Sequence, residues 1–101
     1  MKKIKLRKDK EKIDYYCRGM ANALYIFANI KYIDVEWAVC YEIAYDSIFS
    51  LHYDSLDDLE YYLKHPPYPN MFYMLQDDRY LAKFRYRAER RRIYADEHLT
   101  P

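Results

Sequence analysis

The feature of this sequence that most constrains its fold is a strict alternation of side-chain types over residues 33–43. The odd positions carry large apolar or aromatic residues: Ile33, Val35, Trp37, Val39, Tyr41 and Ile43. The even positions, through residue 44, carry acids or small residues on the opposite side: Asp34, Glu36, Ala38, Cys40, Glu42 and Ala44. Successive side chains of a strand point to opposite faces, so this pattern predicts a strand with one buried face. The alternative is a helix that buries Val35, Ala38, Val39, Ile43 and Ile48.

A second alternating segment follows closely and indicates a hairpin. Residues 48–53 place Phe49, Leu51 and Tyr53 on one side of an extended chain. The Tyr-Asp-Ser sequence at residues 45–47 supplies a turn between the two segments. We therefore expect residues 35–43 and 48–53 to pair as an antiparallel hairpin.

Other segments show the spacing of amphipathic helices. Residues 9–30 have apolar side chains at intervals of three and four: Ile13, Tyr16, Cys17, Met20, Leu24, Phe27 and Ala28. Gly19 weakens this helix without breaking it. Asp54 or Ser55 can cap a second helix, which Pro66 and Pro67 end. We expect one further short helical segment over residues 71–78.

The two ends of the chain complete the predicted topology. Residues 1–8 alternate as a short strand, and residues 80–88 alternate as a last strand. Residues 82–93 equally permit a basic helix. The order β-α-β-β-α-β is that of the ferredoxin-like α+β fold, with a four-stranded antiparallel sheet. We expect one domain over residues 1–93 and a short C-terminal tail over residues 94–101.

Composition narrows the class of protein. A chain of 101 residues, 51% apolar and 33% charged, is long enough for one globular domain. A single glycine excludes glycine-rich phosphate loops, and two cysteines make neither a disulfide framework nor a zinc site. We expect no metal and no cofactor. No apolar run is long enough to span a membrane, and the basic N-terminus lacks the apolar stretch of a signal peptide, so we expect a cytoplasmic protein.

Charge is segregated along the chain. Residues 1–12 have seven basic and two acidic residues, a net charge of +5. Residues 32–78 have ten acids against one lysine, a net charge of −9, and residues 79–92 have seven bases against one acid, a net charge of +6. In the predicted sheet one edge is basic and the other acidic, which favours a two-fold homodimer. The basic residues that share a sheet face also permit nucleic-acid binding: Lys3, Lys5, Arg7, Lys83, Arg85 and Arg87.

A local motif resembles a known family. Residues 47–68 resemble the third strand and second helix of the stress-responsive dimeric A/B barrel (Dabb) domain. The matching positions are Tyr53, Ser55, Leu59, Tyr62, His65 and Pro66. The resemblance implies a dimeric α+β barrel with a small pocket in each subunit. In relatives that are polyketide cyclases, the last histidine of the motif does acid–base work, but that position is Tyr68 here, a poor base at neutral pH.

The same segment contains the candidate site. His65 and Tyr62 are the candidate catalytic residues, because they lie three residues apart on one helix face. Tyr68, His52 and Tyr16 are candidate ligand-binding residues, with the tyrosines as aromatic walls. In the alternative interpretation His65 only caps the helix C-terminus, the tyrosines only pack, and His52 is a surface residue.

Three classes of function follow. The first is a small dimeric α+β barrel that binds or transforms a small aromatic or apolar molecule. The second is a non-enzymatic protein that binds a macromolecular partner, such as a small phage- or plasmid-type inhibitor. The third is single-stranded nucleic-acid binding. A cavity beside Tyr62 and His65 would favour the first class, and a filled core with an exposed tyrosine–arginine patch would favour the second.

Overall fold

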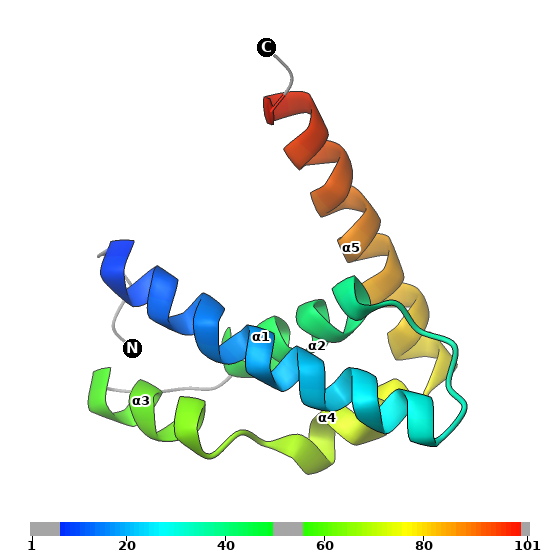
Figure 1. The fold of residues 1–101 in the computed structure, drawn as a ribbon, viewed down its shortest axis with the longest axis horizontal. Coiled ribbons are helices and arrows are strands. Elements are labelled where there is room, and N and C mark those ends of the chain that lie inside the picture. The colour runs from blue at the N-terminus through cyan, green and yellow to red at the C-terminus, as the bar shows by residue number, and fades with distance from the viewer. Residues whose placement is uncertain (1–6, 50–55, 100–101) are drawn as a thin grey trace.

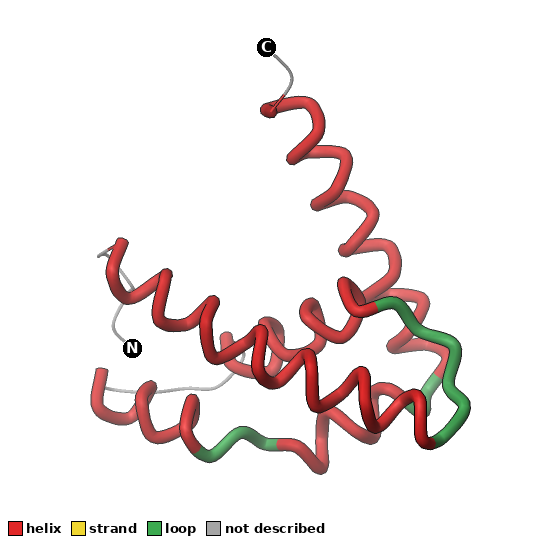
Figure 2. The backbone as a smooth tube through the Cα atoms, in the orientation of Figure 1, coloured by secondary structure: helices red, strands yellow, loops and turns green. Residues whose placement is uncertain are grey.

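The described part of the chain folds into helices. The computed structural model describes residues 7–49 and 56–99, with side chains described over residues 10–48 and 58–92. The helices are α1 (Arg7–Ile30), α2 (Trp37–Phe49), α3 (Leu56–Lys64), α4 (Tyr68–Leu75) and α5 (Asp78–Leu99). No strand occurs within the described residues, as Figure 2 shows.

Helix α2 lies at the centre of the arrangement. It packs against α1, α4 and α5, and its contact with α1 is the most extensive in the protein. Helix α3 packs on α1, on the side away from α5 (Figure 1). Helix α5 contacts α2 and α4, and its C-terminal end extends away from the other helices (Figure 1).

The central position of α2 explains why the predicted hairpin is wrong. Residues 37–49 form one helix, and Cys40 and Ala44, assigned to the solvent side of a strand, are completely buried. A helix that is surrounded by other helices is apolar on most of its sides. Its sequence therefore lacks the apolar residues at intervals of three and four, on one face only, that identify an amphipathic helix. The helical alternative, with Val39, Ile43 and Ile48 buried, is the one that the structure shows.

The predicted fold class fails with the hairpin. The described residues contain no sheet, so the ferredoxin-like fold, the α+β barrel and the resemblance to the Dabb family are wrong. Residues 80–88 belong to α5, which confirms the basic-helix alternative for residues 82–93. The predicted first strand covers residues 1–8, of which residues 1–6 lie outside the described residues and residues 7 and 8 belong to α1. The end of the predicted hairpin falls on residues 50–53, which also lie outside the described residues. The homodimer remains a prediction, but the charged sheet faces that motivated it are absent from the described structure.

The three predicted helices are present. Residues 9–30 lie within α1, the second predicted helix is α3, and the short helical segment is α4, shifted toward its N-terminus. Prolines 66 and 67 separate α3 from α4, and a further proline lies in the first turn of α4, where a missing backbone N–H costs nothing. The predicted boundary between residues 93 and 94 falls inside α5.

The end of α1 has a well-defined cap. The Ile33 N–H donates to the Ala28 carbonyl at 2.8 Å, and the Tyr32 N–H donates to the Asn29 carbonyl at 3.3 Å. This pair of bonds forms a Schellman motif, which requires a left-handed residue. Tyr32 occupies that position with φ 58°.

The core is continuous across all five helices. Its largest fully buried side chains include Ile13, Met20, Leu24, Ile43, Met71, Leu75 and Phe84. Cys17 and Cys40 lie unbridged among them. Burial raises the pKa of Cys17 to about 12 and the pKa of Cys40 to about 11, so both behave as small apolar side chains. Among the described residues, no helix combines the length and apolar composition needed to cross a bilayer.

Candidate functional site

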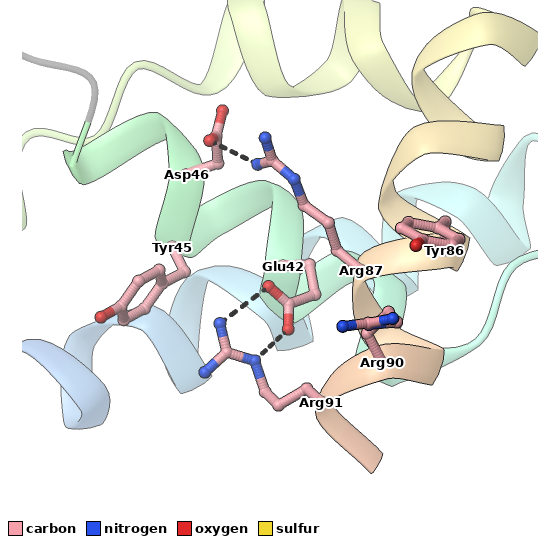
Figure 3. Close-up of a pocket in the computed structure, with 7 residues that line it drawn as sticks. All are labelled: Glu42, Tyr45, Asp46, Tyr86, Arg87, Arg90 and Arg91. Carbon is pink, nitrogen blue, oxygen red and sulfur yellow. Dashed lines mark hydrogen bonds and ion pairs between the residues drawn. The ribbon is translucent and has the colours of Figure 1, made fainter. Parts of the chain in front are cut away.

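Basic residues of α5 pair with acids on and beside α2. The Arg87 Nη1 lies 2.7 Å from the Asp46 Oδ1, and Arg91 pairs with Glu42 (Figure 3). The two arginines are four residues apart on α5, as the two acids are on α2, so successive turns of each helix face one another. The later arginine of α5 pairs with the earlier acid of α2, so the two helices run in opposite directions at this contact, and the two ion pairs fix their register.

The Arg91–Glu42 pair is the most buried of these contacts. The Glu42 side chain is 5% exposed, and Arg91 contacts both of its carboxylate oxygens through Nε and Nη2. The hydrogen bond to Glu42 raises the pKa of Arg91, against an opposing effect of burial. The guanidinium also lies 5.3 Å from the centre of the Tyr45 ring, a cation–π distance. Arg91 therefore joins α5 to α2 by both charge and aromatic contact.

A surface groove of about 600 Å³ runs along this contact. We call it the arginine groove, and it is lined by Glu42, Tyr45, Asp46, Tyr86, Arg87, Arg90 and Arg91 (Figure 3). Arg90 differs from the two neighbouring arginines. Its guanidinium lies 6.0 Å from the Tyr86 ring centre, and no carboxylate among the described residues pairs with it. Tyr86 is 65% exposed, so both side chains are accessible from outside.

A second surface groove of about 630 Å³ lies between α1, α3 and the turn before α4. We call it the tyrosine groove, and its walls include Tyr15, Tyr16, Arg18, Gly19, Lys64, Pro66 and Tyr68. The Tyr68 ring is the end of a three-ring stack, with Phe72 at 5.6 Å and Phe27 behind it at 4.2 Å from Phe72. This stack fixes the orientation of the Tyr68 ring in the groove wall.

The structure brings together only some of the predicted site residues. Tyr16 and Tyr68 line the tyrosine groove, whereas Tyr62 and His65 are not among its lining residues. Tyr62 packs edge-on against Tyr61, with ring centres 5.6 Å apart. His52 lies outside the described residues.

His65 occupies a position typical of a helix cap. Its Nδ1 lies 3.0 Å from the Tyr61 carbonyl oxygen, its backbone N–H donates to the same oxygen, and its ring stacks on Tyr61 at 4.4 Å. Burial raises the pKa of Tyr68, which makes this tyrosine a still poorer base at neutral pH. Catalysis by His65 and Tyr62 remains a prediction.

Sequence reasoning missed the two residues that distinguish the grooves, Arg90 and Gly19. The predicted last strand ends at residue 88, so Arg90 lies outside it and falls only within the alternative basic helix over residues 82–93. The helical signal was present in the spacing of Lys83, Tyr86, Arg87 and Arg90 at three, four and seven residues. Gly19 was treated only as a weak point of α1.

Metal chemistry has no support in the described part of the chain, which contains no group of three histidine, cysteine or acidic side chains placed to hold an ion. No family model, no curated protein and no solved structure matches this chain. Function is therefore assigned from the geometry and charge of the two grooves.

Proposed function

We propose that this protein is a non-enzymatic interaction protein that binds an acidic segment of a partner protein along α5, at the arginine groove. The observation that carries the proposal is the environment of Arg90. This arginine lies beside the exposed Tyr86, and no carboxylate among the described residues neutralises its charge. The core is one continuous apolar cluster, and every buried side-chain polar atom among the described residues has a hydrogen-bond partner.

The basic residues of α5 divide into two groups. Arg87, Arg91 and Arg92 pair with carboxylates and hold the helix in place. Lys83, Arg85 and Arg90 have no carboxylate partner among the described residues. Arg85 donates to the main-chain carbonyl of Asp34 at 2.6 Å, and the Lys83 Nζ lies 5.5 Å from the Phe84 ring centre. Of these three residues, Arg90 lines the arginine groove, whereas Arg85 lines a separate pocket together with Asp34.

The chemistry of the surface favours a protein over a nucleic acid. Tyrosine and arginine are the side chains most enriched at the energetic centres of protein interfaces. Polyphosphate binding requires many unpaired cations, whereas Arg87 and Arg91 of this groove are paired with Asp46 and Glu42, and only Arg90 has no carboxylate partner among the described residues. The net charge of the whole chain is only +1. A carboxylate on a partner could pair with Arg90 while its apolar neighbours cover Tyr86.

Binding of labelled acidic, tyrosine-containing peptides, followed by fluorescence anisotropy, tests this function. Arg90→Glu should weaken binding about tenfold, the effect of a moderate interface hot spot. Arg79→Glu is the matched control, because it makes the same charge change on α5 outside the groove, at a side chain 89% exposed. Circular dichroism establishes that both variants keep the helical fold.

Three results would contradict the proposal. If both variants lose affinity equally, only net charge matters and the groove is not the site. Absence of binding across a panel of such peptides would refute the partner class. If a single-stranded oligonucleotide binds more tightly, with an affinity that falls steeply as salt rises, nucleic-acid binding replaces the proposed function.

A further inference from the structure

Gly19 has no structural reason to be glycine. Glycine is the least favourable residue inside a helix apart from proline, and proteins retain it where a residue has positive φ or where a neighbour approaches closely. No glycine of the described chain has positive φ. A Cβ built on Gly19 would meet no heavy atom within 4 Å, apart from those of its own helix backbone and chain neighbours. The space left beside this residue is therefore not used by the folded chain.

That space opens into the tyrosine groove. Gly19 lies in the groove wall, with Tyr15 and Tyr16 one helical turn before it. Tyr68 and Pro66 form the opposite side, and Met20 and Leu63 add apolar surface. A bare stretch of helix between aromatic side chains lets a flat molecule approach the backbone closely. The groove volume of about 630 Å³ is in the range of small-molecule sites.

The charged residues of the groove select the sign of the ligand. Among the residues that line it, the ones that carry formal charge are Arg18 and Lys64, and both are cationic. Asp14 holds Arg18 by its Nε at 2.8 Å, and the other oxygen of Asp14 accepts from the Tyr41 hydroxyl. Asp14 thus holds the Arg18 guanidinium through Nε, and the remaining N–H donors of the guanidinium point away from Asp14.

Lys64 is only partly neutralised. It lies 3.3 Å from the Glu60 Oε1, and Lys12 contacts the same oxygen at 2.9 Å. The two lysines lower the pKa of Glu60, chiefly through the hydrogen bond from Lys12. Lys64 therefore shares its carboxylate partner with a second lysine.

We infer that the tyrosine groove binds a small planar aromatic carboxylate, whose ring lies over Gly19 between the tyrosines and whose carboxylate pairs with Arg18 and Lys64. The tyrosines supply stacking surface, and the two cations supply charge-assisted hydrogen bonds. This site is on α1, α3 and the turn before α4, so it is separate from the arginine groove on α2 and α5. It does not depend on the proposed function.

Gly19 also supplies the reporter for a test. It is the only glycine of the chain. Its amide resonance is therefore readily identified in a two-dimensional ¹⁵N–¹H NMR spectrum. Titration with 1-naphthoate should shift this resonance in a saturable manner. The neutral amide 1-naphthamide should bind about tenfold more weakly, because it lacks the charge that Arg18 and Lys64 recognise.

Two variants and one control locate the binding. Gly19→Leu fills the groove with a good helix former at an exposed position, so it should abolish naphthoate binding and preserve the circular dichroism spectrum. Asn29→Leu, an exposed position of α1 outside the groove, is the control and should bind normally. Arg18→Gln should weaken naphthoate about fivefold and leave naphthamide unchanged.

The outcomes separate cleanly. Naphthoate that binds Gly19→Leu as well as the unmodified protein would place the site elsewhere and overturn the inference. Equal affinity for naphthoate and naphthamide would overturn the anionic class of ligand. If neither compound binds, or if a proline-rich peptide shifts Gly19 and naphthoate does not, the aromatic carboxylate is the wrong occupant.

Discussion

Substitution of Arg91 by methionine should lower the free energy of unfolding by about 2 kcal/mol. The expectation comes from unequal burial, because the Glu42 side chain is 5% exposed and the Arg91 side chain is 57% exposed. Removing one partner of a fully buried pair costs about 3–5 kcal/mol, whereas an exposed pair contributes about 0–1 kcal/mol. One buried and one exposed partner place this pair between the two ranges. Methionine retains much of the aliphatic stem, so the loss reports the guanidinium.

Urea unfolding followed by far-ultraviolet circular dichroism measures this loss. For a slope of about 1–2 kcal/mol per molar urea, the midpoint should fall by roughly 1–2 M. Arg92→Met is the matched control on the same helix, because its partners Glu36 and Glu89 are 73% and 59% exposed. The control should cost less than about 0.5 kcal/mol.

A double variant distinguishes a lost attraction from a charge left unpaired. Adding Glu42→Met to Arg91→Met removes the buried carboxylate and should recover most of the lost stability, since well-packed apolar residues often replace buried ion pairs without cost. Equal losses in the free energy of unfolding for Arg91→Met and Arg92→Met would show that the burial of Glu42 does not set the cost. The reasoning is also refuted if the double variant is less stable than Arg91→Met alone.

Two further substitutions test local features of the fold. The hydrogen bond from the Tyr41 hydroxyl is the main cause of the lowered pKa of Asp14. A carboxylate with a lowered pKa stabilises the folded protein at pH values above its ordinary pKa of 3.8. This stabilisation is lost as the pH falls through the lowered pKa. Tyr41→Phe should therefore cost about 1 kcal/mol at neutral pH and flatten the acid side of the stability profile; an unchanged acid side would contradict this. Tyr32 is left-handed and 96% exposed, so Tyr32→Gly should stabilise the protein by up to about 1 kcal/mol in thermal unfolding, and a lower melting temperature would show that the ring makes an unrecognised contact.

Helices at the edge of the structure could be predicted from the sequence. Helix α1 buries one stripe, with Ile13, Cys17, Met20 and Leu24 at intervals of three and four, and leaves its other side in solvent. The pattern of a half-buried helix is local, because each side chain is buried or exposed according to its position on the helix surface. The prolines after α3 were equally informative, since their effect on the backbone does not depend on tertiary contacts.

The candidate sites show the same division. The sequence alone identified a basic stretch over residues 79–92 and identified Tyr16 and Tyr68 as ligand candidates. Which arginines are neutralised depends on acids up to 56 residues away, as in the pair of Arg92 with Glu36. Likewise, the groove beside Gly19 exists only because α3 and the turn before α4 pack against α1.

Helix α2 is the element whose structure only the tertiary arrangement decided. Residues 33–43 are apolar on alternate positions, a pattern that a strand with one buried face and a helix with several buried faces both produce. Neighbours on several sides of α2 bury Cys40 and Ala44 as fully as Ile43. Burial on several sides removes the helical period from the sequence, because that period records the difference between a buried and an exposed face.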